Sequence, residues 1–125
     1  MKEVSREYIR VGRDEVSDIT LHGFAICGED VVRRRIGESE RASPEVLAHL
    51  AADEVSAVRK AVASNSRTPL AVLFRLVDDR DADVRFSMAE NHNLPFAVLK
   101  RLAADENPYV SCRAKETIKR VVRAS

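Results

Sequence analysis

Two regularly spaced columns of charged residues are the features of this sequence with the clearest capacity for chemistry. The columns repeat with a period of about 26 residues and consist of Arg33, Arg59 and Arg85, and of Asp53, Asp79 and Asp105. A row of arginines along one face of a helical array could bind the phosphates of a nucleic acid. The structural interpretation is favoured, because an aspartate at a helix start caps the helix and pairs with an arginine of the same or the neighbouring unit.

A second group of basic residues lies near the end of the chain. Arginine and lysine outnumber a single glutamate between residues 113 and 123. Cations near a helix C-terminus complement the helix dipole, and a charged outer face suits the end of a stacked array. The alternative is a docking surface for an acidic partner or a nucleic acid. The candidate partner or phosphate contacts are therefore Arg33, Arg59, Arg85, Arg113, Lys115, Lys119 and Arg120.

The remaining reactive side chains predict no catalytic centre. His22, His49 and His92 do not share one repeat column, and no serine, cysteine or carboxylate stands at a catalytic spacing from them. Four scattered glycines cannot form a phosphate-binding loop. We therefore expect no enzymatic activity and no bound cofactor.

Metal binding is not expected either. The acidic run at residues 78–83 lacks the glycine and the terminal glutamate of a calcium loop, so we expect it to start a helix at Asp81 or Asp83. Cys27 and Cys112 are too few for a four-thiolate site. Both cysteines lie in apolar patterns, which predicts that they are small core residues.

Length and composition are typical of one globular domain. The 125 residues are 45% hydrophobic and 33% charged, and the net charge is +1, so no overall charge favours nucleic acid or membrane. The first residues lack the apolar stretch of a signal peptide, and no apolar run is long enough to span a membrane. We therefore expect a cytoplasmic protein. Residues 1–30 contain seven acidic and four basic residues, so weak end-to-end self-association is an alternative to a monomer.

An internal repeat must position these side chains. Apolar columns recur at the same interval as the charged ones, at Val32, Val58, Val84 and Val110 and at Leu47, Leu73 and Leu99. Within each unit the apolar spacings predict two amphipathic helices. The predicted arrangement is a single repeat domain over 1–125. It has a degenerate capping repeat over 6–31, repeats over 32–57, 58–83 and 84–109, and a closing helix over 110–125.

Polar and proline residues mark the predicted helix ends. Pro44, Pro69 and Pro95 are expected at first helical positions, with Ser43 and Thr68 as N-caps. Asn65 and Asn91 are expected to end the preceding helices in a left-handed turn. Pro44 stands three residues before its leucine, whereas Pro69 and Pro95 stand four residues before theirs. This difference predicts a one-residue adjustment in the connection.

The unit from Val58 to Asp79 resembles the leucine-rich repeat variant family, through Ala63, Asn65, Thr68, Pro69, Leu73 and Leu76. The unit from Val84 to Asp105 matches the same pattern apart from Met88 and Leu94. The resemblance implies an all-α, right-handed solenoid in which short α-helices alternate with still shorter, often 3₁₀, helices, related to HEAT-like repeats. It implies no shared catalytic activity.

Together these features predict a non-catalytic protein-interaction scaffold of the α-solenoid type, with a protein or peptide partner. The alternative is nucleic-acid backbone binding through the arginine column and the basic C-terminal helix. Neither the scaffold hypothesis nor the nucleic-acid alternative requires a membrane, a metal or a cofactor.

Overall fold

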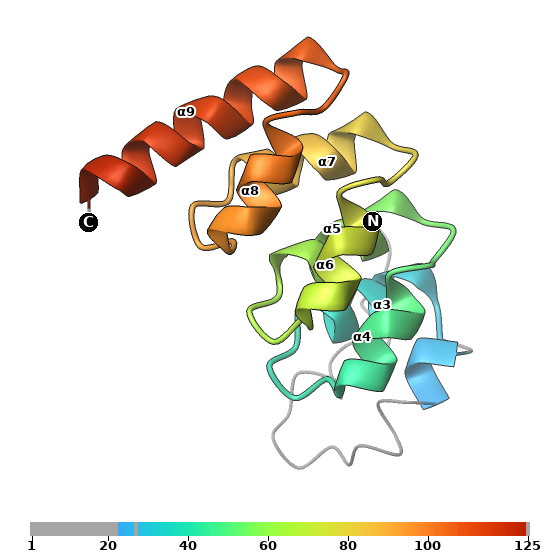
Figure 1. Cartoon of the computed structure of the whole chain (residues 1–125). Helices are drawn as coiled ribbons and strands as arrows, with labels where there is room; N and C mark the ends of the chain where they lie inside the picture. The colour runs from blue at the N-terminus through green and yellow to red at the C-terminus, as the bar shows by residue number, and fades with distance from the viewer. Residues whose placement is uncertain (1–22, 27, 125) are drawn as a thin grey trace, which may run out of the picture. The chain divides into compact units, whose positions relative to one another are not determined.

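The computed structural model describes residues 23–26 and 28–124, and all regular structure within these ranges is helical (Figure 1). The predicted all-α fold is therefore confirmed. Most of the predicted capping repeat over 6–31 lies outside the described residues, as do His22 and Cys27. The handedness of the predicted solenoid and its organisation as one continuous domain stay predictions.

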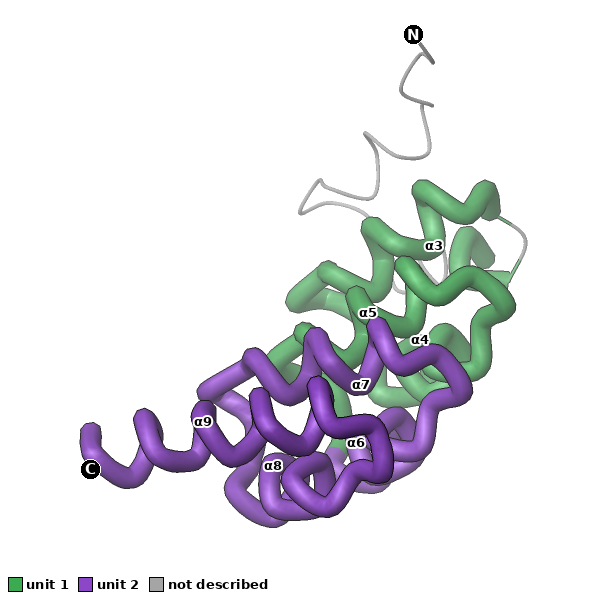
Figure 2. Tube along the Cα trace, turned by 90° about the horizontal axis from the view of Figure 1, so that it is seen from above, with its two compact units in different colours: residues 1–69 green, residues 70–125 purple. Residues whose placement is uncertain are grey.

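The chain divides into two compact units, residues 1–69 and residues 70–125 (Figure 2). Unit 1 contains helices α3 (Asp30–Gly37), α4 (Pro44–Leu50) and α5 (Ser56–Ser64). Unit 2 contains α6 (Leu70–Leu76), α7 (Ala82–Ala89), α8 (Phe96–Leu102) and α9 (Pro108–Ala124).

The helix starts follow the sequence repeat. One series of helices begins at Asp30, Ser56, Ala82 and Pro108, and the other begins at Pro44, Leu70 and Phe96, so successive starts in both series are separated by the interval of the sequence repeat. The connections before α4, α6 and α8 have six, five and six residues, and the difference comes from α5, which is one residue longer than α3 and α7. The one-residue adjustment expected in the connection before α4 is therefore wrong. The prolines change position instead: Pro44 is the first residue of α4, whereas Pro69 and Pro95 immediately precede α6 and α8. Both positions tolerate proline because neither needs a backbone N–H donor.

The shorter helices α4, α6 and α8 are seven-residue α-helices rather than 3₁₀ helices. Hydrogen bonds of the 3₁₀ type occur where they end. The N–H groups of Asp53, Asp79 and Asp105 each donate to the carbonyl oxygen three residues earlier, at 3.1, 3.0 and 3.0 Å. Each repeated aspartate is thereby held directly after a helix.

The apolar columns form the core, as their spacing predicts. Val32, Val58, Val84 and Val110 are all buried, and the leucine columns of the shorter helices are buried with them. In unit 1, α3 packs on α5, and in unit 2, α9 packs on both α7 and α8. Gly37 permits the close approach of α5 to α3, because a Cβ atom at this position would lie 3.1 Å from the Ala61 Cβ.

A further column of buried residues precedes the shorter helices. Thr68 belongs to this column, so the capping role expected for it is wrong. Ala42, Thr68 and Leu94 are separated by the repeat interval and are all buried. Thr68 does not cap α6; its hydroxyl donates to the Val62 carbonyl at 2.6 Å, which satisfies a buried polar group. Ser43 is the N-cap of α4, as predicted, and accepts a hydrogen bond from the Val46 N–H at 3.2 Å.

The backbone at Asn65 also differs from expectation. No residue in the described ranges has a positive φ angle, and Asn65 is extended, with φ −77° and ψ 124°. The left-handed turn predicted here is therefore wrong. The side chain takes over the role of the turn, because the Asn65 Oδ1 accepts from the Arg67 N–H at 2.9 Å. Asn91 makes the equivalent bond to the Asn93 N–H, also at 2.9 Å.

The long closing helix is present as α9. Its buried face consists of Val110, Ala114 and Thr117. Cys112 is exposed, so its prediction as a core residue is wrong. Two positions after Val110, Cys112 lies about 200° further around the helix and points away from the buried face. None of the helices in the described part of the chain has the length and apolar content needed to cross a bilayer.

Candidate functional site

Arg33 and Arg85, two members of the arginine column, form ion pairs inside the fold. The Arg33 Nε lies 2.7 Å from the Asp53 Oδ2, and the Arg85 Nε lies 2.8 Å from the Asp105 Oδ2. In both pairs the aspartate follows the arginine by 20 residues. All four side chains are largely shielded from solvent, which strengthens the attraction between the charges.

The same arginines also bond the connection that precedes their own helix. The Arg33 Nη1 donates to the Gly28 carbonyl at 2.7 Å, and the Arg85 Nη1 donates to the Asp79 carbonyl at 2.5 Å. Arg59 is 3% exposed, and its Nη1 donates to the Asp53 carbonyl at 2.7 Å. The guanidinium groups therefore satisfy backbone acceptors where the chain turns.

The repeated aspartates shape these turns as well. Asp53 accepts a hydrogen bond from the Val55 N–H at 2.9 Å through Oδ1. Asp79 and Asp105 accept equivalent bonds from the N–H groups two residues later, at 2.9 and 2.8 Å. Asp81 then caps α7 by accepting from the Asp83 N–H, in agreement with the helix start predicted there.

The Arg33–Asp53 pair shifts the titration of both groups. Burial opposes ionisation of Asp53, but hydrogen bonds from Arg33 and from the Val55 N–H, together with the Arg33 charge, hold the pKa of Asp53 below its ordinary value of 3.8. The hydrogen bond to Asp53 raises the pKa of Arg33. Both groups are therefore charged at neutral pH.

Side chains from one polar column form hydrogen bonds between successive repeats. The Asn65 Nδ2 donates to the Gly37 and Ser39 carbonyls, each at 2.8 Å. Thr117 stands two periods after Asn65, and its hydroxyl donates to the Ala89 carbonyl at 2.5 Å. Both the Asn65–Gly37 and the Thr117–Ala89 bonds span 28 residues. Thr117 was not singled out from the sequence, although its place one period after Asn91 was a usable signal.

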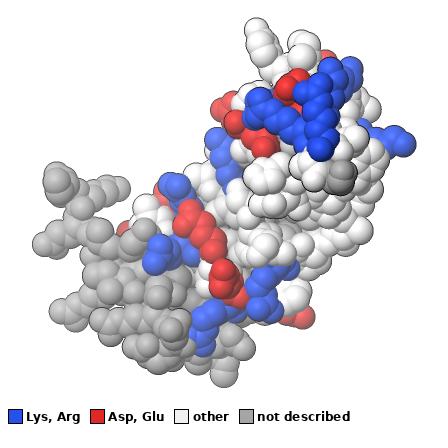
Figure 3. Space-filling view, turned by 90° about the vertical axis from the view of Figure 1, so that its left-hand side faces the viewer, with Lys and Arg blue, Asp and Glu red and all other residues white. Residues whose placement is uncertain are grey.

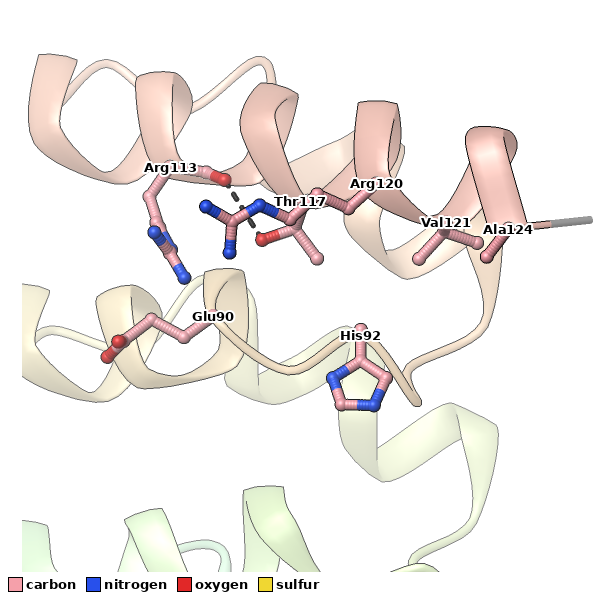
Figure 4. Close-up of a pocket in the computed structure, with 7 residues that line it drawn as sticks. All are labelled: Glu90, His92, Arg113, Thr117, Arg120, Val121 and Ala124. Atoms are coloured by element: carbon pink, nitrogen blue, oxygen red, sulfur yellow. Dashed lines mark hydrogen bonds between the residues drawn. The ribbon is translucent and has the colours of Figure 1, made fainter.

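The other predicted basic residues lie on α9. Figure 3 shows basic side chains gathered around α9, with acidic side chains among them. Lys115 and Lys119 are exposed. Arg113 and Arg120 instead line a surface hollow of about 430 Å³, together with Glu90 and His92 from the end of α7 and the following connection (Figure 4).

This hollow joins residues that the repeat pattern does not connect. His92 and Glu90 were not among the residues predicted to form a site, because neither belongs to a charged column. The Arg113 Nε is buried and has no hydrogen-bond partner among the described residues. In contrast, the Arg120 Nε lies 3.6 Å from the Glu116 Oε1 one helical turn away, in a solvent-exposed pair.

No metal centre emerges from the described side chains. Within residues 23–26 and 28–124, no group of histidine, cysteine and carboxylate side chains is arranged to hold a metal ion.

The recurring helix pairs and the hydrogen bonds between successive repeats define the class of this chain as a helical-repeat protein. Residues 57–81 match the leucine rich repeat variant family, a HEAT-like helical repeat family, which confirms the resemblance seen in the sequence. Repeats of this family are in general non-catalytic scaffolds. No curated protein and no solved structure matches the chain.

Proposed function

We propose that this chain is a non-catalytic scaffold that binds a protein or peptide partner on the surface of its helical repeats. The observation that carries the proposal is that arginines of the repeated column form ion pairs with aspartates within the fold. Arg33 and Arg85 bind Asp53 and Asp105 within the fold, at 2.7 and 2.8 Å. Breaking these pairs to contact phosphates would leave aspartates that are less than one-tenth exposed without their cations.

Exposed apolar side chains in unit 2 give this proposal candidate contact residues. Leu70 and Phe96 are the first residues of α6 and α8, and they are 49% and 54% exposed. Large apolar side chains of this kind suit a protein contact, because a partner can cover them and exclude water. Stacked repeats also offer extended surfaces rather than one deep pocket.

Affinity purification on the full chain tests the scaffold against nucleic-acid binding. One half of a native lysate is treated with nuclease, and every captured protein is then purified and titrated against the chain by calorimetry. We expect a protein that survives nuclease treatment and binds directly in a fixed ratio. Phe96→Ser should weaken that binding, whereas Ala97→Ser, at an exposed position on the same helix, should not.

The nucleic-acid alternative makes the opposite prediction. Retention would disappear after nuclease treatment, and a purified oligonucleotide would bind with an affinity that falls steeply as salt is raised. That result, or the absence of any direct protein partner in both halves of the lysate, would contradict the scaffold.

A further inference from the structure

The outer faces of α6 and α8 combine exposed apolar and basic side chains. On both helices the first, fifth and sixth residues are exposed and lie within about 140° of one another around the helix, on the side opposite the buried residues. We call these residues the α6–α8 surface, and they are Leu70, Phe74, Arg75, Phe96, Lys100 and Arg101.

The two helices lie side by side in unit 2 (Figures 1 and 2). The Arg101 Nη2, in the last turn of α8, lies 3.3 Å from the Asp78 Oδ1, just after the end of α6. Both residues line a hollow of about 320 Å³. Because α6 and α8 have the same length and equivalent places in successive repeats, their first residues lie at the same end of the helix pair. The exposed residues of the two helices therefore belong to one surface.

The repeat itself does not require large apolar residues on this surface. Leu70, Phe74 and Phe96 are 49%, 37% and 54% exposed. The corresponding helix of unit 1, α4, has proline, alanine and histidine at the same three positions, while its buried columns are unchanged. Large apolar side chains that are exposed without serving the core favour contact with a partner that covers them.

The basic side chains of this surface are accessible to the same partner. Arg75 and Lys100 are exposed, and neither forms an ion pair or a side-chain hydrogen bond in the described part of the chain. Their charges complement the helix dipoles while the charged groups stay in solvent. Along each helix, the apolar first residue and the unpaired cation are separated by a rise of about 6–7.5 Å.

We propose that the α6–α8 surface binds a short extended segment of the protein partner in which a large apolar residue stands two positions from a carboxylate. The proposal rests on the scaffold function. Two residues of extended chain span about 6.6 Å, which matches the rise between the apolar and basic parts of the surface. The apolar side chain would cover Leu70 and Phe96, and the carboxylate would lie near Arg75 and Lys100.

The apolar part of the surface favours a protein segment over a nucleic acid. Bases stack on aromatic rings, and Leu70 offers none. A nucleic acid has no aliphatic side chain that could cover Leu70, and it brings a phosphate with every nucleotide to a surface that has only two unpaired cations in the described part of the chain.

Selection from a display library of short random peptides tests the proposal on the full chain. We expect the enriched peptides to contain a large apolar residue two positions from an aspartate or glutamate more often than the unselected library does. A synthetic copy of the most enriched peptide, labelled with fluorescein, is then titrated against the chain by fluorescence anisotropy.

The apolar contact is tested by one pair of matched variants. Leu70→Ser should weaken peptide binding by about fivefold or more, because the covered side chain is lost. Val122→Ser changes an apolar residue that is 58% exposed on α9, outside the surface. It should alter the affinity by less than about 1.5-fold, and circular dichroism should be unchanged in both variants.

The charge contact is tested by a pair of double variants. Arg75→Gln with Lys100→Gln should weaken peptide binding by about fivefold or more, because both unpaired cations of the surface are removed. Lys115→Gln with Lys119→Gln removes the same charge from exposed positions on α9 and should change the affinity by less than about twofold.

Several outcomes would overturn the proposal. These are the absence of enriched peptides, enriched peptides without carboxylates, equal losses from the two double variants, or tighter binding of a single-stranded oligonucleotide than of the peptide. If Phe96→Ser weakens the partner captured from lysate but the Arg75 and Lys100 double variant does not, the acidic segment is wrong while the scaffold stands. If no captured protein binds directly, the scaffold itself fails.

Discussion

The Arg33 Nε lies 2.7 Å from the Asp53 Oδ2, although the two residues are 20 positions apart in the sequence. Arg33 stands in the first helix of one unit, and Asp53 stands just after its second helix. Because Asp53 also bonds the Val55 N–H, one carboxylate links the arginine to the start of α5. The same arrangement recurs between Arg85 and Asp105.

Replacing Asp53 should destabilise the fold in two separable steps. Asp53→Asn keeps an oxygen for the Val55 N–H but removes the charge, so it should lower the free energy of unfolding by about 1–2 kcal/mol. Asp53→Ala also removes the turn and leaves Arg33 without its anion, so the loss should reach about 2–4 kcal/mol. Urea unfolding followed by circular dichroism measures both values.

The exposed Arg34–Glu38 pair is the control for this series. Its side chains are more than two-fifths exposed, at a distance of 3.2 Å. Glu38→Ala should cost less than about 0.5 kcal/mol, because solvent screens the pair. A loss equal to that of Asp53→Ala would mean that burial does not strengthen the repeated pairs.

Lowering the pH should remove the contribution of the Asp53 charge to the stability of the fold. Its pKa lies below 3.8 in the folded protein and returns toward 3.8 on unfolding. The stabilisation is therefore complete above pH 3.8 and is lost as the pH falls through the folded value. The stability difference between the wild type and Asp53→Asn should shrink as the pH is lowered from neutral to about pH 3. A difference that stays constant over this range would show that the charge of Asp53 does not stabilise the fold.

The two leucines of α6 should differ sharply in their effect on stability. Leu73 is 5% exposed and Leu70 is 49% exposed. Leu73→Ala should lower the free energy of unfolding by about 2–5 kcal/mol, because it opens a cavity in the core. Leu70→Ala should cost less than about 1 kcal/mol. Chemical denaturation of both variants measures these losses. Equal losses would show that Leu70 contributes to the core as much as Leu73.

The Thr117 hydroxyl should hold α9 to the end of α7, the preceding helix of the same series. Thr117 is buried, and Thr117→Val keeps its shape but removes the bond to the Ala89 carbonyl. We expect a loss of about 1–2 kcal/mol, since a buried acceptor loses its donor. Ser111→Ala removes a longer, exposed bond of 3.3 Å to Pro108 and should change stability by less than about 0.5 kcal/mol. Amide exchange near the end of α9 should rise only in the first variant.

The sequence by itself determined the spacing of the helices and which valines and leucines are buried. Valines one repeat period apart fall on the inner face of each first helix, and leucines at the same interval fall on the inner face of each second helix. These features depend on the helical period and on the removal of apolar surface from water, and both can be calculated along a single chain.

Only the tertiary structure decided which polar groups meet. The sequence predicted that Arg33 would pair with an aspartate of its own or the neighbouring unit, but packing selected Asp53. Packing likewise turned Thr68 from a cap into a core residue, and placed Arg113, Arg120 and His92 around one surface hollow. A long polar side chain bonds whichever acceptor the packed helices place within about 3 Å of its donor, and that distance is set by contacts between segments remote in sequence.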